Sequence, residues 1–170
     1  MAMKTPNDGP LTVPFTVVID TREQRPFDFT GLTSDARHGR RPLVVPTVVG
    51  TLGQGDYSLA GLGDVVAVER KSHGDLVGTR SQGRDRFERE LERLAGLLWA
   101  AVVVEADWAQ VLAGHERSHL NPKTVHRSVI AWQQRYPSIH WWFCTDRRLA
   151  EVTTFRILER WWTKHREGAE

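Results

Sequence analysis

Short apolar runs alternate with amphipathic segments along most of the chain. The runs are rich in β-branched residues and are bounded by Gly, Pro or Asp, a pattern that is typical of β-strands. They predict strands over residues 15–20, 43–49, 56–59, 65–70, 100–104 and 139–143. Glycine-rich turns separate the second, third and fourth of these strands, which indicates a hairpin or a meander in this part of the chain.

Other apolar residues recur at helical spacing. Four of them are separated by four, three and four positions, which predicts one apolar stripe on a helix: Phe87, Leu91, Leu94 and Leu98. We expect the charged residues of the same segment to face solvent: Arg86, Glu88, Arg89, Glu90 and Glu92.

Helix-start signals predict three further helices. Asp107 precedes a helix over residues 108–113, and the Asn-Pro pair at 121–122 begins a helix that extends to about residue 136. The last helix is expected to begin after Asp146 and to end near residue 162.

The succession of strands and helices predicts one α/β domain over residues 15–170. Its central β-sheet is expected to be mixed and to be flanked by helices on both faces. Residues 1–14 contain three prolines and little apolar surface, so we expect them to form a flexible N-terminal leader.

Composition narrows the class of protein. The 170 residues are 40% hydrophobic, which is enough to bury a core, and the net charge of +2 means that any affinity for polyanions must come from local patches. Cys144 is the single cysteine, which excludes an intramolecular disulfide and a cysteine-based zinc site. No apolar run approaches the roughly 18 residues of a membrane span. We therefore expect no membrane partner and a cytoplasmic protein, and the 19 Arg against 4 Lys suggest a bacterial, archaeal or viral host cell with a GC-rich genome.

Acidic residues stand at the ends of the predicted apolar strands. Asp20 ends the first strand, Asp56 begins another, and Glu69 and Lys71 end the next. Because side chains alternate along a strand, Glu69 and Lys71 point to one face and Arg70 to the other. Carboxylates gathered at one point repel one another, and a divalent cation would offset that cost. Mg²⁺ prefers such oxygen ligands, so the pattern favours metal-dependent phosphodiester hydrolysis.

Five ordered motifs resemble one known family. They are Ile19-Asp-Thr-Arg-Glu23, Gly55-Asp-Tyr-Ser-Leu59, Val68-Glu-Arg-Lys71, Asp75 four positions later, and Gly83-Arg84 leading to Phe87. This order is similar to the nuclease domain of the XPF-type structure-specific endonucleases, whose signature is a GD pair, a spacer and then ERK-x-x-x-D. The match covers about residues 17–105. It implies a restriction-endonuclease-like PD-(D/E)xK core and Mg²⁺- or Mn²⁺-dependent cleavage of DNA near junctions of duplex and single strand, in repair or recombination.

The resemblance also implies roles for individual residues. Three carboxylates are expected to be metal ligands: Asp20, Asp56 and Glu69. Lys71 is the expected catalytic lysine, with Glu23 and Asp75 as supporting catalytic carboxylates. Five arginines are expected to bind DNA or to support the site: Arg22, Arg70, Arg80, Arg84 and Arg86.

Several of these residues have ordinary structural interpretations that remain open. Asp20 could form a turn at the end of its strand, and Asp75 could cap a helix. The basic loop at residues 37–41 is expected to be a solvated segment. His115 and His119 are spaced like a metal-binding pair, but no cysteine lies nearby and Gly114 interrupts the helix, so we predict no zinc site there.

Partners and alternative functions follow from the resemblance. Members of the family carry helix-hairpin-helix domains after the nuclease, and we expect none in this chain, so a homodimer or a separate DNA-binding subunit is predicted. Trp161 and Trp162 are adjacent on the last helix, and one of them is expected to pack on that partner. Two alternatives remain: a restriction-like or homing-like nuclease with a sequence preference, and a catalytically silent DNA-binding scaffold.

Overall fold

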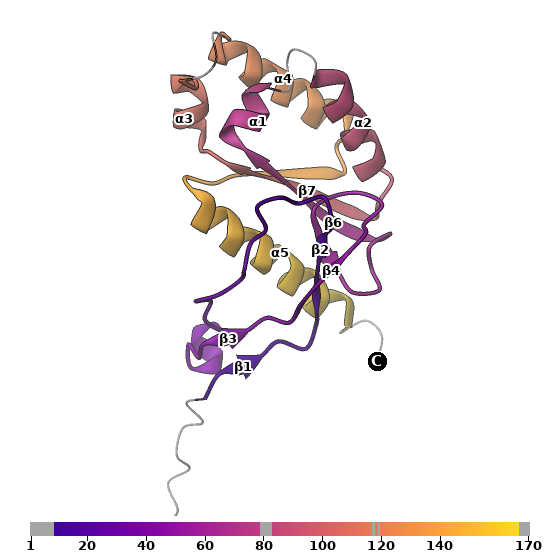
Figure 1. Ribbon diagram of the computed structural model, residues 1–170, viewed down its shortest axis with the longest axis vertical. Helices are drawn as coiled ribbons and strands as arrows, with labels where there is room; N and C mark the ends of the chain where they lie inside the picture. Colours follow the sequence, from indigo (N-terminus) through magenta and orange to yellow (C-terminus); the bar gives the residue numbers. More distant parts are fainter. Residues whose placement is uncertain (1–8, 79–82, 117, 119, 167–170) are drawn as a thin grey trace, which may run out of the picture.

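The computed structural model describes residues 9–78, 83–116, 118 and 120–166 (Figure 1). A six-stranded sheet forms its centre, in the order β4-β2-β5-β6-β7-β8. Strand β2 pairs in parallel with β4 and antiparallel with β5, β5 pairs antiparallel with β6, and β6, β7 and β8 are parallel. The bounds are β2 Val17–Asp20, β4 Thr47–Gly50, β5 Tyr57–Leu59, β6 Val66–Ser72, β7 Trp99–Glu105 and β8 Ile139–Phe143. The predicted mixed sheet is confirmed.

Helices cover both faces of this sheet (Figure 1). Four lie on one face: α1 His73–Gly78, α2 Arg84–Leu94, α3 Trp108–Ala113 and α4 Pro122–Arg135. The long helix α5, Arg147–Arg166, lies on the other face. Asp107 and Asn121 cap α3 and α4 with their side chains, as their positions predict. Among the described residues, no helix is both long enough and apolar enough to cross a membrane.

Alternation along the strands creates two hydrophobic cores. Val66 and Val68 of β6 pack on the side of α5, whereas Ala67 between them packs on the side of α1 to α4. Strand β7 is buried on both faces in the same way, which accounts for its uninterrupted apolar run. The alternation continues past Val68, so Glu69 and Lys71 lie on the α2 side of the sheet and Arg70 lies on the α5 side.

Pro46 divides the strand that was predicted over residues 43–49. The structure has β3, Leu43–Val44, and β4 instead, because a proline has no N–H to donate to a ladder. Strand β4 then pairs with β2, so the predicted meander is wrong for this strand, whereas β5 and β6 are the antiparallel neighbours that a hairpin requires.

The end of the predicted leader, residues 9–14, is part of the fold rather than a flexible segment. Residues Leu11–Thr12 form β1, which pairs in parallel with β3 in a separate two-stranded sheet. Val13 is buried in the core on the α5 side, and this burial explains why the backbone is held here. Residues 1–8 of the predicted leader lie outside the described part of the chain.

The apolar stripe of α2 ends earlier than its spacing predicts. Phe87, Leu91 and Leu94 are buried, but the helix ends at Leu94 and Leu98 is 71% exposed. The turn after the helix brings Leu97 into the core in its place. Glu90 also departs from expectation, since its side chain is only 17% exposed.

The two tryptophans at the end of α5 are buried to different extents. Trp161 is buried, and Trp162 is half-buried with its ring 5.9 Å from that of Phe15. The chain itself therefore supplies a packing surface for Trp162. Trp142 on β8 is the more exposed ring, at 46%.

Candidate active site

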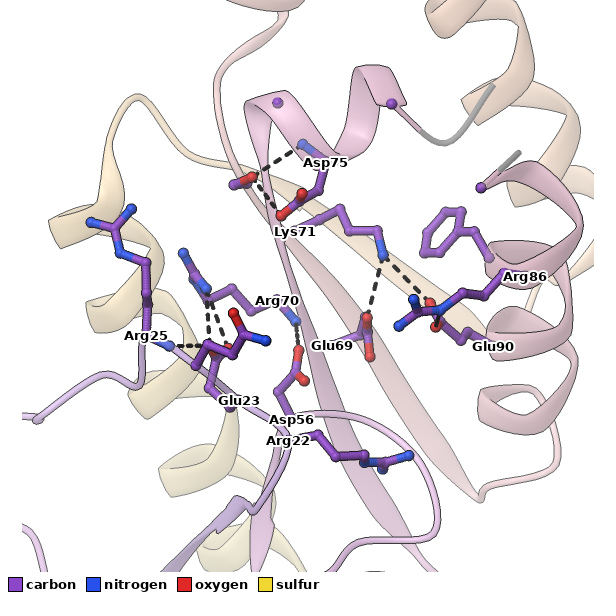
Figure 2. A pocket seen from close by; sticks show the side chains of 16 residues that line it. Arg22, Glu23, Arg25, Asp56, Glu69, Arg70, Lys71, Asp75, Arg86 and Glu90 are labelled. Atoms are coloured by element: carbon purple, nitrogen blue, oxygen red, sulfur yellow. Dashed lines mark hydrogen bonds and ion pairs between the residues drawn. The ribbon is translucent and has the colours of Figure 1, made fainter. Parts of the chain in front are cut away.

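A cavity of about 660 Å³ opens beside the end of β6, between the turn after β2 and helices α1 and α2 (Figure 2). Most of the predicted site residues line it: Arg22, Glu23, Asp56, Glu69, Arg70, Lys71, Asp75 and Arg86. A smaller cavity of about 140 Å³ shares Asp56, Glu69 and Lys71 with it. Residues from motifs that are far apart in the sequence thus meet at one end of the sheet.

Lys71 lies between two carboxylates and an aromatic ring. Its Nζ is 3.5 Å from Oε1 of Glu69 and 3.4 Å from Oε2 of Glu90, and it is 4.1 Å from the centre of the Phe87 ring (Figure 2). The side chains of Glu69 and Lys71 are each about 12% exposed. Strand alternation brings Glu69 and Lys71 together, and α2 supplies the other two groups.

Asp56 is positioned by the backbone of β6. Its N–H donates to the carbonyl of Val68, and its Oδ2 accepts a hydrogen bond of 2.7 Å from the N–H of Arg70. The preceding Gly55 has a φ of +75°, and a Cβ at this position would lie 2.8 Å from the Cβ of Ala67. Glycine is therefore required for Asp56 to approach β6 this closely.

The environment favours the protonated forms of Asp56 and Glu69. Burial raises the pKa of Asp56 to about 6, and the negative charge of Glu23 adds to this effect. Burial likewise raises the pKa of Glu69 to about 8, together with the negative charges of Asp56 and Glu90. A cation bound between Asp56 and Glu69 would remove this penalty, because it favours the charged form of both.

The carboxylates available suit a hard divalent cation held by two protein ligands. Among the described residues, no group of three or more His, Cys, Asp or Glu side chains is arranged to hold a metal ion. Asp56 and Glu69 nevertheless line the same cavities, and Mg²⁺ commonly takes only one or two carboxylates, with water and phosphate oxygens as its other ligands. The donor set therefore fits Mg²⁺ or Mn²⁺.

Asp20 was expected to be a third metal ligand, but its carboxylate does not line the cavities that Asp56 and Glu69 share. Its side chain is 1% exposed and accepts hydrogen bonds from the N–H of Arg22 at 2.9 Å and of Leu52 at 2.7 Å. Nε of Arg22 lies 2.6 Å from the same carboxylate. Burial alone would raise the pKa of Asp20, but the hydrogen bonds from Arg22 and Leu52 lower it overall. Asp20 thus forms the turn at the end of β2 and orients Arg22, whose side chain is 63% exposed at the cavity.

Arg70 belongs to a buried ion-pair network on the opposite face of β6. Its guanidinium lies 3.2 Å from Glu23 and 2.7 Å from Glu105, and Glu105 lies 2.9 Å from Arg147 at the start of α5. Only 8% of the Arg70 side chain is exposed, so of its two expected roles the placement suits support of the site rather than contact with a DNA backbone. Sequence reasoning missed Glu105 and Arg147, because their contact with Arg70 depends on strand pairing and helix docking.

The other predicted residues have mixed placements. Asp75 lines the cavity, but its carboxylate accepts a hydrogen bond of 2.6 Å from the hydroxyl of Ser72, the last residue of β6. Its N–H donates to the same hydroxyl at 3.1 Å, an arrangement that suits a cap at the start of α1. Arg84 pairs with Glu88 on the same helix. Arg86 is 80% exposed at the cavity rim. Arg80 and His119 lie outside the described residues.

Glu90, Arg25 and Arg93 line these cavities without having been predicted to do so. For Glu90 the sequence did hold a signal. It is three positions after the buried Phe87 and one before the buried Leu91, so it borders the apolar stripe of α2 rather than facing away from it.

Comparisons with known proteins identify a family and similar folds for this chain. The family model described as the ERCC4 domain matches residues 19–154. Among solved structures, the chain is similar to XPF from Aeropyrum pernix, with 21% identity and a TM-score of 0.59 over 84% of this chain and 59% of that one. It is similar to XPF from Aeropyrum pernix in complex with DNA, with 21% identity and a TM-score of 0.61 over 88% and 66%. No curated protein matches the sequence.

The structural likeness confirms the predicted restriction-endonuclease-like α/β core. This chain spans less than two thirds of the length of the two XPF chains. The ERCC4 model matches far more than half of the chain, and the matched range contains Asp20, Asp56, Glu69 and Lys71. The resemblance to XPF-type nuclease domains that the motifs indicated is therefore confirmed, and the chain belongs to the ERCC4 domain family.

Proposed function

We propose that this chain is a divalent-metal-dependent DNA endonuclease that acts on branched, flap or fork DNA in repair or recombination. The observation that carries the proposal is the meeting of Asp56, Glu69 and Lys71 at one cavity, with Arg22 and Arg86 at its rim. Membership of the ERCC4 domain family supports nuclease activity. The similarity to an XPF structure solved in complex with DNA supports DNA as the substrate.

Asp56 and Glu69 would hold the cation, Mg²⁺ or Mn²⁺. When bound, such an ion polarises a phosphoryl oxygen and makes a water molecule more acidic. Both carboxylates must be ionised to act as ligands, so metal binding is expected to release protons near neutral pH. We assign Asp20 to orienting Arg22, because its carboxylate already accepts hydrogen bonds from Arg22 and Leu52.

Lys71 would act on the reacting phosphate. Its ammonium group lies beside Glu69 in a mostly buried position, where an electrostatic interaction is stronger than in water. From there it can orient the attacking water or neutralise the negative charge that develops on the phosphate. Asp56 is held by the N–H of Arg70, which keeps its carboxylate at the same end of β6.

Exposed arginines at the cavity rim would position the DNA. Arg22 and Arg86 are 63% and 80% exposed, and Arg25 is exposed across the same cavity, near Glu23 (Figure 2). Guanidinium groups bind phosphate oxygens without reading bases, so we expect binding that weakens steeply with added salt and does not depend on sequence.

Cleavage assays on end-labelled DNA test the proposal. The purified chain is incubated with flap, fork and linear duplex DNA in the presence of Mg²⁺, Mn²⁺ or EDTA, beside Asp56→Asn and Lys71→Ala. Asp64→Asn is the matched control, because Asp64 is an exposed carboxylate in the turn before β6 and does not line either cavity. We expect metal-dependent cuts near the branch point that both site variants slow strongly and the control retains.

The alternatives make different predictions in the same assay. Cuts at one defined sequence in linear duplex, without preference for a branch, would favour a restriction-like or homing-like nuclease. Binding to DNA without cleavage under every metal condition would contradict the proposal and favour a DNA-binding scaffold.

We further propose a homodimer or a separate DNA-binding subunit, as the resemblance to XPF-type nucleases implies. Light scattering measures the mass of the purified chain in solution. Twice the chain mass of 19.4 kDa would support the homodimer, whereas the mass of one chain would contradict it and favour the separate subunit.

A further inference from the structure

Helix α2 contributes a carboxylate to the surroundings of Lys71. The two carboxylates beside the ammonium come from different elements: Glu69 from β6, at 3.5 Å, and Glu90 from α2, at 3.4 Å. Figure 2 shows Lys71 extending between them. No motif in the sequence pointed to Glu90, whose position next to Lys71 is created by the packing of α2 on the sheet.

Glu90 is fixed by its own contacts. Its Oε1 lies 3.1 Å from Nε of Arg86, one turn earlier on α2, while its Oε2 faces Lys71. The neighbouring Phe87 and Leu91 are buried, at 1% and 0% exposure, and anchor this part of the helix. Burial of the two apolar side chains therefore holds the Glu90 carboxylate at the cavity, and Phe87 also places its ring 4.1 Å from Nζ of Lys71.

Glu90 gives Lys71 a second carboxylate partner, one that is not a proposed metal ligand. Glu69 is a proposed metal ligand, and a carboxylate that binds a divalent cation interacts less favourably with a second cation beside it. Glu90 lies on α2 rather than β6, and it can keep its contact with Nζ of Lys71. An ammonium group held from α2 would then stay at the phosphate while Glu69 binds the cation.

We propose that Glu90 is a positioning residue of the nuclease site, which holds the Lys71 ammonium beside Glu69 and acts on cleavage through Lys71. This inference rests on the proposed function. It differs from a purely structural ion pair in a measurable way, because a structural pair would change the stability of the chain without changing the rate of the chemical step in the folded enzyme.

A double-mutant cycle on the full chain tests this inference. The variants are Glu90→Ala, Glu90→Gln and Lys71→Ala, together with the double variant Glu90→Ala/Lys71→Ala. Glu92→Gln is the matched control, because Glu92 lies on the same helix but is 53% exposed and faces Arg135. Each variant is measured by thermal unfolding without metal and by cleavage kinetics that separate kcat from KM.

Glu90→Ala is expected to lower kcat on the order of tenfold to a hundredfold, because a displaced catalytic group costs rate while DNA contacts persist. KM should stay within about twofold, because the proposed contacts between the rim arginines and the DNA do not involve Lys71 and remain in place. Glu90→Gln keeps an oxygen that can accept from Nζ and should recover part of the rate, and Glu92→Gln should match the wild type. In the Lys71→Ala background, Glu90→Ala should have little further effect on kcat or on Tm.

Several results would overturn the inference. One is a loss of kcat on Glu90→Ala that is equally large with and without Lys71, because Glu90 would then act independently. Another is a change in KM alone, which would indicate a role in binding DNA. If the wild type cleaves no DNA, the proposed function fails separately, and the Tm cycle still decides whether Glu90 holds Lys71: no coupling between the two residues would refute it.

Discussion

Replacement of Glu69 by glutamine isolates the effect of one buried carboxylate on stability. The side chains have nearly the same shape, so the substitution removes an ionisable group while leaving the packing around it largely intact. Glu69 lies in the cavity between Asp56 and Lys71, with 12% of its side chain exposed. We expect the wild type, without divalent metal, to lose stability as the pH rises from about 5.5 to about 8, and the Glu69→Gln variant to lose much less.

The sign and size follow from the pKa of Glu69, which burial raises from 4.5 to about 8. In this pH range the folded chain keeps a proton that the unfolded chain has released. Stability must therefore fall as pH rises, until the folded carboxyl also ionises near pH 8. At about 1.4 kcal/mol per pKa unit, the loss between about pH 5.5 and about pH 8 is on the order of 3 kcal/mol. Asp56, whose pKa is raised to about 6, adds a smaller contribution over the same range.

Urea unfolding followed by tryptophan fluorescence measures this difference. The wild type, Glu69→Gln and the Glu92→Gln control are compared at both pH values in EDTA. Mg²⁺ at about pH 8 should then restore stability to the wild type and to the control but not to Glu69→Gln, because the cation binds the ionised pair. Equal pH dependence in the wild type and Glu69→Gln would refute the reasoning.

Four other substitutions test how the fold positions the site. Leu91→Ala should cost about 3 kcal/mol in urea unfolding because its side chain is fully buried, whereas Leu98→Ala, at a 71% exposed position, should change stability by less than about 0.5 kcal/mol. Gly55→Ala should destabilise by about 1 to 3 kcal/mol, because φ is +75° and the added Cβ would meet β6, and it should reduce cleavage more than binding. Arg70→Met should lower the free energy of unfolding by about 3 kcal/mol, since it leaves two buried carboxylates without their shared cation, and a stability equal to the wild type would contradict the network.

Local patterns predicted a large part of the fold. Alternation along β6 placed Glu69 and Lys71 on one face, and the burial of β7 on both faces matches its continuous apolar run. The capping signals at Asp107 and Asn121 predicted where α3 and α4 begin. These features were predictable because each depends on the conformational preferences of neighbouring residues.

Errors arose where a local signal competed with a longer-range contact. The periodic spacing from Phe87 to Leu98 continued past the end of α2, and Leu97 occupies the core instead. Residues Leu11–Thr12 read as a loose segment because their partner strand lies about thirty residues further along the chain. Two residues alone carry too little pattern to predict a strand that exists only through this pairing.

The sequence by itself determined which chemical groups this chain can offer: Glu69 and Lys71 on one face of β6, and Asp56 before β5, after a glycine that lets it approach β6. Only the tertiary structure decided which partners these groups contact. It engaged Asp20 with Arg22, enclosed Arg70 between Glu23 and Glu105, and brought Glu90 to Lys71. The physical reason is that a side chain's charge state and partners depend on burial and on contacts between distant segments, which form only when helices pack on the sheet.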